Sequence, residues 1–255
     1  KNFSEKNFKK LHSFFWLFTI DLKSSKKITR SVISNWTNLN QNYSFKSWEL
    51  DTLSKRIISW IANSNNFYHE GDESFKLNFT KIIKKQLNHL TNEIENTELV
   101  NDKMIGCSAI IMGGLCFKHQ LHYLNMGFQL LKKIINTIFD NNGFPKSRNP
   151  RQVIFYLKYF VFIRELLRDS NTDIPEYLNE IIFYLGQSFD FYFEDNDCTF
   201  LFNGNHNLEI ATFKKYLKEL TPDVDMGYPF ECPKCGASQE VDVPLGTGFF
   251  WPDSE

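Results

Sequence analysis

The chain has 255 residues, of which 42% are hydrophobic and 16% aromatic, and it can bury a substantial core in one large domain or two small ones. Its 29 Lys and Arg residues nearly balance 30 Asp and Glu residues, and the net charge of -1 provides no overall field to attract nucleic acid or an anionic membrane. No run approaches the roughly 20 apolar residues that a membrane-spanning helix needs. The apolar stretch 14–20 is short and lacks a small-residue cleavage site, so no signal peptide is predicted.

Apolar residues recur at spacings of three and four along about eight stretches, which is the period of an amphipathic helix. The first four stretches are residues 8–18, 28–39, 53–61 and 75–94. Each carries its apolar residues on one face and therefore needs a neighbouring helix. The pattern predicts an all-α fold, in which only residues 198–202 have a strand-like sequence.

Residues 104–117 form an unusual fifth stretch, because apolar side chains cover nearly its whole circumference. A helix of this kind belongs in the interior of a domain. Gly106, Gly113 and Gly114 lower its intrinsic helix propensity. We expect these glycines to permit the close approach of another helix, with contact to a substrate as the weaker alternative.

A polar loop at residues 141–149, NNGFPKSRN, separates two long apolar helical stretches. Asn149 is a favourable N-cap and Pro150 a favoured first helical residue, so the loop ends where a helix begins. The next helix opens at residues 173–176, and a second polar loop, FNGNHN, follows at 202–207. These two loops are where we expect chemistry or recognition, since nearly all the remaining sequence predicts helices and helix caps.

Successive pairs of amphipathic helices without intervening strands suggest either a solenoid or a closed ring of helical hairpins, an α/α toroid. No motif of fixed period is visible, which disfavours the standard helical repeats. The helix pattern therefore favours the toroid.

Five short pieces stand out in the sequence: FFWL at 14–17, RIISWI at 56–61, GGL at 113–115, Gly143 with SRNP at 147–150, and FNG at 202–204. In this order they resemble the N-terminal region of bacterial heparinase II/III-like proteins, and the resemblance covers residues 1 to about 220. The resemblance implies an incomplete α/α toroid that precedes an antiparallel β-sandwich, with the substrate cleft between them. It also implies β-elimination on an acidic, uronic-acid polysaccharide such as a glycosaminoglycan, and a periplasmic or cell-envelope location.

The implied reaction sets requirements for the two loops. One group must hold the uronate carboxylate while negative charge develops, and a Tyr or His must exchange the C5 proton. Arg148 can clamp a carboxylate with two N–H groups, and Asn149 can donate its amide. The alternative is that Asn149 only caps its helix and Arg148 pairs with a nearby acid.

The second loop offers Asn203 and Asn205 as amide donors and His206 as a base, because its ring titrates near neutral pH. Alternatively, Asn203-Gly204 is simply a turn and His206 is exposed. Tyr156, in the helix after the first loop, is either a proton carrier or a core aromatic. The catalytic candidates are thus Tyr156 and His206, and the substrate-binding candidates are Arg148, Asn149, Asn203 and Asn205.

The chain departs from the family in two respects. Gly143-Phe144-Pro145-Lys146 stands where many relatives carry a Gly-Gly-His-like sequence, so a loop histidine is absent. The sequence predicts no β-sandwich, and half of the expected cleft is missing with it. We therefore expect a carbohydrate-binding toroid that is incomplete as a lyase, with a non-catalytic helical scaffold as the alternative.

Residues 221–255 differ in composition from the rest of the chain. No Asn follows Asn207 and no Ile follows Ile210, and Gly, Pro and Val become frequent instead. The pieces CPKC, VDVPL and FFWP make this tail resemble a segment of T4-like phage baseplate hub proteins. We predict two domains, 1–220 and 221–255, the second a natural fusion or a foreign piece, and a phage baseplate component is a further functional alternative.

The tail carries one candidate metal site. Cys232 and Cys235 supply two of the four ligands that a tetrahedral zinc needs, so zinc would require completion from elsewhere. Residues 240–244 alternate polar and apolar like a short strand. The aromatic residues at 249–251 would be costly to leave exposed and predict a protein partner for the tail.

Overall fold

The computed structural model describes residues 4–20, 22, 25–117, 121–193, 227–231 and 238–242. The chain divides into two compact units, Lys1–Phe202 and Asn203–Glu255. The described part of the first unit is helical, which confirms the all-α prediction for this unit. None of the helices in the described ranges is long and apolar enough to cross a membrane.

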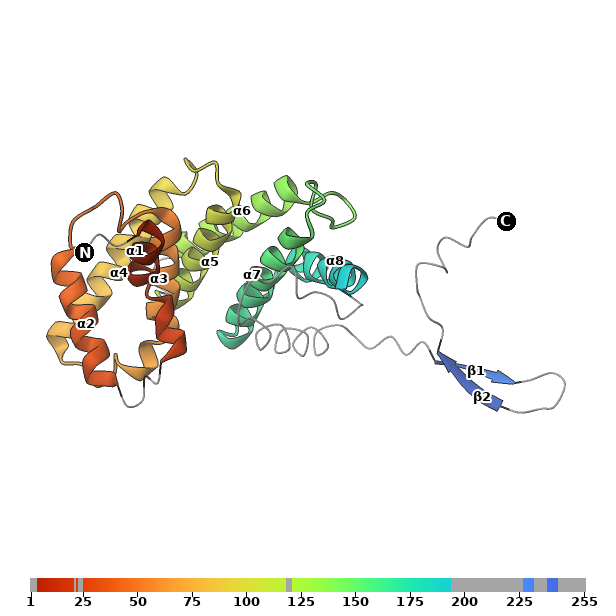
Figure 1. Cartoon of the computed structure of the whole chain (residues 1–255), viewed down its shortest axis with the longest axis horizontal. Coiled ribbons are helices and arrows are strands. Elements are labelled where there is room, and N and C mark those ends of the chain that lie inside the picture. Colours follow the sequence, from red (N-terminus) through yellow and green to blue (C-terminus); the bar gives the residue numbers. More distant parts are fainter. Residues whose placement is uncertain are drawn as a thin grey trace. The chain divides into compact units, whose positions relative to one another are not determined.

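Eight α-helices and two short 3₁₀ helices make up the first unit within its described residues (Figure 1). They are α1 (Glu5–His12), η1 (Phe15–Thr19), α2 (Lys26–Leu39), α3 (Leu50–Ala62), η2 (Ser64–Asn66), α4 (Glu73–Glu93), α5 (Val100–Cys116), α6 (Leu121–Ile138), α7 (Pro150–Asp169) and α8 (Glu176–Phe193).

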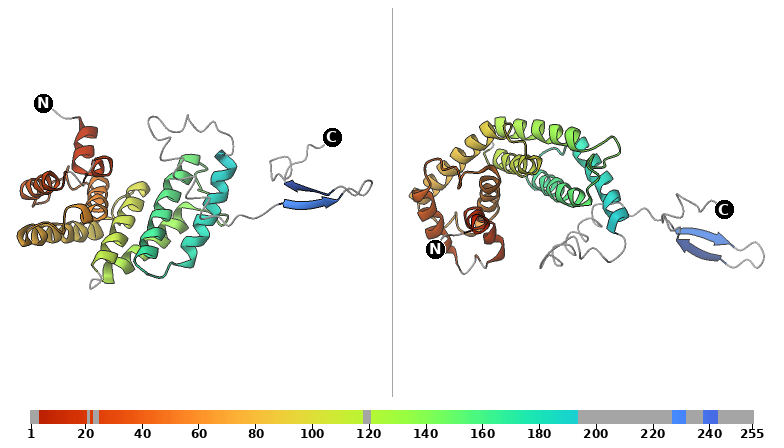
Figure 2. Two further views of the ribbon diagram at one scale, coloured as in Figure 1. Left: turned by 90° about the horizontal axis from the view of Figure 1, so that it is seen from below. Right: turned by 45° about the horizontal axis from the view of Figure 1, so that its top comes forward.

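The helices of the first unit are arranged in two rows. The odd-numbered helices pack in chain order, α1 against α3, α3 against α5 and α5 against α7. The even-numbered helices cover them, with α4 against α3 and α5, α6 against α5, and α8 against α7. In Figure 2 the even-numbered row lies outside the odd-numbered row.

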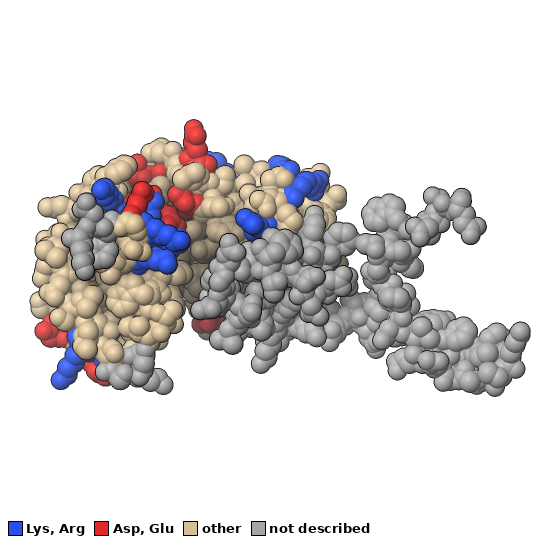
Figure 3. Space-filling view, in the orientation of Figure 1, with Lys and Arg blue, Asp and Glu red and all other residues tan. Residues whose placement is uncertain are grey.

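Acidic and basic side chains lie close together on the face shown in Figure 3, in keeping with the near-zero net charge.

Local capping chemistry explains where several helices begin. The side chain of Asp72 accepts a hydrogen bond from the Phe75 amide at 2.7 Å and starts α4. Asn149 accepts from the Arg151 amide at 3.0 Å, and Pro150 is the first residue of α7. Each cap satisfies an N–H group that has no partner within the helix. The predicted helix start after the 141–149 loop is confirmed.

An aromatic cluster forms the core beneath α1, α2 and α3. Trp36 and Trp60 meet edge to face with ring centroids 5.4 Å apart, and Phe14 meets Trp60 in the same manner at 5.1 Å. Such pairs are worth about 0.5–1.5 kcal/mol beyond the area they bury. The prediction of one continuous helix over residues 8–18 is wrong, because Phe14 has a φ of 57° and separates α1 from η1.

The second predicted apolar face is only partly buried. Ile33 and Trp36 of α2 lie in the core, whereas Ile28, Val32 and Leu39 are 67%, 38% and 85% exposed. The apolar spacing alone did not distinguish these two groups. Neighbouring helices cover only the side of α2 that carries Ile33 and Trp36.

The fifth helix, α5, is the most interior element of the unit. All its residues from Met104 to Gly114 are buried, as its apolar circumference predicted. A Cβ atom added at Gly113 would lie 2.6 Å from Leu87, and one added at Gly114 would lie 2.7 Å from the backbone nitrogen of Leu124. The expected close approach of other helices to these glycines is confirmed.

We predict that Gly114→Ala destabilises the protein by about 1–3 kcal/mol, because the new methyl group meets the α6 backbone, which cannot move without displacing the helix. Gly106→Ala is the matched control, since its methyl group meets the terminal Cδ1 atom of Ile94, which can rotate away. Urea unfolding followed by circular dichroism measures both losses. Equal losses at the two positions would contradict a backbone contact between α5 and α6.

The described residues of the second unit form one antiparallel hairpin of β1 (Gly227–Glu231) and β2 (Ser238–Asp242), in which Gly227 pairs with Asp242. The strand predicted over 240–244 overlaps β2. The predicted domain boundary after residue 220 lies inside this second unit, which begins at Asn203. Cys232 and Cys235, the candidate zinc ligands, lie outside the described residues.

Candidate functional site

The loop between α6 and α7 is organised by a single carboxylate, that of Asp140. Its Oδ1 atom accepts hydrogen bonds from the backbone N–H groups of Asn142 at 3.0 Å and Phe144 at 3.1 Å. Its Oδ2 atom pairs with the Arg148 guanidinium at 2.8 Å. Much of the polar character of this loop is therefore used to hold its own backbone.

Arg148 and Asn149, the predicted substrate ligands of this loop, both have partners within the protein. Arg148 pairs with Asp140, and its guanidinium carbon lies 5.6 Å from the centre of the Phe144 ring. Asn149 caps α7 through the Arg151 amide. The Arg148 side chain is still 61% exposed, so a ligand can reach it only in competition with Asp140.

Tyr156, a predicted catalytic residue, lies in the core of the first unit. Its side chain is fully buried, and its hydroxyl has no hydrogen-bond partner among the described residues. Burial raises the pKa of this phenol to about 12. In this position the hydroxyl is out of reach of a polysaccharide and harder to ionise than an exposed tyrosine.

The other predicted site residues, Asn203, Asn205 and His206, lie outside the described residues. The structure therefore brings Arg148 and Asn149 together at the start of α7 and places Tyr156 inside the core. Within the described ranges, no group of three or more His, Cys, Asp or Glu side chains is arranged to hold a metal ion.

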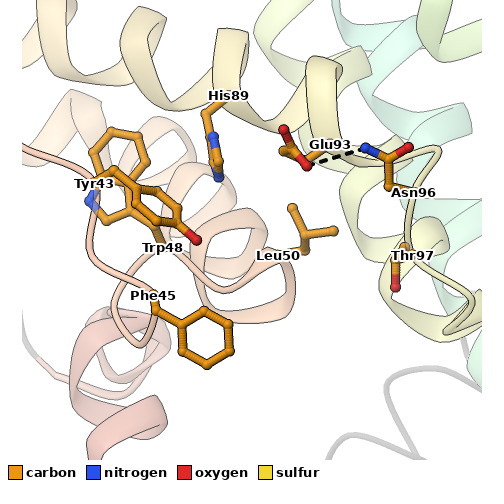
Figure 4. Close-up of a pocket in the computed structure, with 8 residues that line it drawn as sticks. All are labelled: Tyr43, Phe45, Trp48, Leu50, His89, Glu93, Asn96 and Thr97. Carbon is orange, nitrogen blue, oxygen red and sulfur yellow. Dashed lines mark hydrogen bonds between the residues drawn. The ribbon is translucent and has the colours of Figure 1, made fainter.

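A pocket of about 540 Å³ opens where the chain segment before α3 meets the end of α4 and the α4–α5 connection (Figure 4). We call it the aromatic pocket. It is lined by Tyr43, Phe45, Trp48, Leu50, His89, Glu93, Asn96 and Thr97.

Three rings form one side of the aromatic pocket. Tyr43 lies 5.1 Å from His89 and 6.3 Å from Trp48 between ring centroids, and Trp48 lies 5.5 Å from His89. Trp48 is 2% exposed, whereas Tyr43 and Phe45 are 59% and 81% exposed. Trp48 thus anchors the wall, and Tyr43 and Phe45 present aromatic surface to solvent.

Polar groups form the opposite side of the aromatic pocket, as Figure 4 shows. The Asn96 amide donates a hydrogen bond of 3.2 Å to Oε2 of Glu93. Burial lowers the pKa of the His89 imidazole below its ordinary value, and the Glu93 carboxylate offsets this only in part. At neutral pH the pocket therefore combines a neutral imidazole with one carboxylate.

Comparisons with models of protein families, with curated proteins and with solved structures found no match for this chain.

The sequence predictions missed the aromatic pocket. One local signal was present in the segment NLNQNYSF at residues 38–45, where Tyr43 and Phe45 stand among Asn, Gln and Ser. Aromatic side chains in a polar connection are costly to expose and can mark a binding surface. The pocket residues of α4 gave no such signal, because His89 and Glu93 fit the polar face of an amphipathic helix.

We predict that Arg148→Gln raises the pKa of Asp140 toward its ordinary value. In the folded protein burial favours the neutral acid, but the Phe144 and Asn142 amides and the Arg148 charge outweigh it, so the pKa of Asp140 is lowered. The variant removes the charge and leaves the two amides, so a smaller lowering should remain. NMR titration of the Asp140 carboxyl carbon measures the change.

A carboxyl group with a lowered folded-state pKa stabilises the fold above its unfolded-state pKa of about 4 and loses this effect as the pH falls through the folded value. The contribution of Asp140 should therefore be present at neutral pH and disappear in acid. Arg151→Gln, at an exposed position in the first turn of α7, is the control and should leave the titration unchanged. An unaltered Asp140 pKa in Arg148→Gln would refute the ion pair.

Proposed function

We propose that the first unit binds carbohydrate through the aromatic pocket. The observation that carries this proposal is the exposure of Tyr43 and Phe45 beside the polar groups of Glu93 and Asn96 in one pocket. A sugar ring has an apolar face of C–H groups and an edge of hydroxyl groups. Flat aromatic side chains match the face, while the carboxylate and the amide match the edge.

The size and composition of the pocket support the same ligand class. Small-molecule sites commonly enclose about 300–1,000 Å³ and combine apolar walls with a few placed polar groups. The aromatic pocket, at about 540 Å³, lies within this range. It can hold a short stretch of sugar units, with Leu50 as its apolar base between the two walls (Figure 4).

We propose an incomplete α/α toroid as the architecture that carries this site. Support comes from the inner row of odd-numbered helices and the outer row of even-numbered helices. The resemblance to the N-terminal region of heparinase II/III-like proteins agrees with both the architecture and a saccharide ligand. The aromatic pocket lies at the connections that lead from an even-numbered helix into the next odd-numbered one.

The proposed activity is binding, without uronate elimination at this pocket. Elimination needs a cation or a strong donor to neutralise the uronate carboxylate, and none of the residues that line the pocket is Lys or Arg. Arg148 is paired with Asp140. Tyr156 is buried and has a raised pKa, so it is poorly suited to exchange a proton with a polymer.

We predict that Phe45→Ala and Tyr43→Ala each weaken oligosaccharide binding by about 2- to 10-fold, which corresponds to the 0.5–1.5 kcal/mol typical of an aromatic contact. Isothermal titration of the full chain with cellotetraose, chitotetraose and tetragalacturonate measures this loss. Phe45 is 81% exposed, so its removal should leave the unfolding midpoint nearly unchanged.

Phe18→Ala provides the matched control, because Phe18 is a 50% exposed aromatic in η1 and lies outside the aromatic pocket. It should leave binding intact. The proposal fails if the wild-type chain binds none of the oligosaccharides, or if Phe18→Ala weakens binding as much as Phe45→Ala does. Either result would favour a helical scaffold without a saccharide site.

A further inference from the structure

The residues that line the aromatic pocket carry formal charge of one sign only, which is negative. Glu93 is the one carboxylate among its lining residues, and Lys and Arg are absent from that set. Glu93 is exposed and forms no ion pair among the described residues. Among the residues that the structure describes, the carboxylate therefore faces the pocket without a positive partner.

The Glu93 carboxylate is also held in position. Asn96 donates to Oε2 of Glu93 at 3.2 Å, and this contact leaves Oε1 as an acceptor for a ligand. A sugar hydroxyl and an ammonium group can both donate a charge-assisted hydrogen bond to this carboxylate. Only the ammonium group adds the attraction between opposite charges, so it gains more from Glu93 than a hydroxyl group does.

The aromatic wall favours the same sign of charge. The exposed faces of Tyr43 and Phe45 carry negative electrostatic potential and attract cations within about 6 Å of the ring centre. The protein itself provides one example, since the Lys85 ammonium lies 5.8 Å from the Trp48 centroid. Lys85 donates to the Gln41 carbonyl and does not line the pocket, so it offsets the field of Glu93 only from outside.

We infer that the aromatic pocket selects a sugar unit that carries a protonated amine, such as a glucosamine unit, over neutral or uronic-acid sugars. The ammonium group sits against Glu93, and the sugar face lies on the aromatic wall. This inference rests on the proposed carbohydrate binding and names the class of sugar. It replaces the acidic polysaccharide that the family resemblance implied with one of opposite charge.

The test measures the binding of three tetrasaccharides to the full chain at about pH 6, where an amino group whose pKa lies above this value is mostly protonated. They are built of glucosamine, N-acetylglucosamine and galacturonate units. Isothermal titration should show glucosamine tetramer binding about 10-fold more tightly than the N-acetylated tetramer, with the galacturonate tetramer weakest. Acetylation removes the charge and keeps the sugar ring. The difference in affinity between the glucosamine and N-acetylglucosamine tetramers therefore measures the contribution of the charged amine.

The variant Glu93→Gln should remove the preference for the amine while the N-acetylated tetramer still binds. Glu98→Gln is the matched control, because Glu98 is exposed in the same α4–α5 connection and does not line the pocket. It should retain the preference. A preference that survives in Glu93→Gln, or that is lost equally in Glu98→Gln, overturns the assignment to Glu93.

The outcomes separate this inference from the proposed function. Equal binding of the charged and acetylated tetramers overturns amine selection and leaves carbohydrate binding in place. Absence of binding by all three overturns both. Tighter binding of N-trimethyllysine than of the glucosamine tetramer would show recognition of a cationic group without a sugar, and this also overturns the inference.

Discussion

Arg56 is a fully buried cation on which the packing of the first helices depends. Its guanidinium donates to the carbonyl oxygens of His12 and Ser47, each at 2.9 Å, and to the Gln86 amide oxygen at 2.8 Å. It also lies 4.2 Å from the centre of the Trp36 ring. Burial lowers the pKa of Arg56 to about 9, so it remains protonated at neutral pH. With no carboxylate partner among the described residues, its charge is balanced by dipoles and a ring, which makes any displacement of these segments costly.

The same buried cation positions two of the chain segments that form the aromatic pocket. The carbonyl that it fixes in the segment before α3 belongs to Ser47, directly before the wall residue Trp48. On α4 it fixes Gln86, which lies one turn before His89 and therefore on the same side of that helix. Arg56 thus couples the pocket geometry to the core, although it lies outside the set of lining residues. A site built from connecting segments can be well ordered in this way because a rigid interior group holds the backbone behind it.

Local and interior features of the fold followed from the sequence, whereas features that depend on distant partners did not. The start of α7 was predictable because Asn149 and Pro150 act on their own helix. The break at Phe14 was not, since its left-handed backbone is held by distant contacts, including a 2.6 Å hydrogen bond from the Ser59 hydroxyl to the Phe14 carbonyl. Likewise, the spacing of Ile28 on α2 predicted an apolar face, but only the positions of other helices decide which side is covered. The spacing of apolar residues predicts that a helix forms, but it does not predict which other helices pack against it.

The two polar connections show why polar composition alone does not identify a binding site. Buried and half-buried backbone N–H and C=O groups need hydrogen-bond partners. The polar side chains of a loop therefore often serve to satisfy the loop's own backbone. This is the case for the 141–149 loop, where Asp140 satisfies two backbone amides and Arg148. The segment that carries Phe45 presents the opposite situation, because this ring is 81% exposed and gains little burial when the chain folds. An exposed side chain that makes few contacts within the protein is therefore stronger support for a ligand site than a side chain that is already paired within the protein.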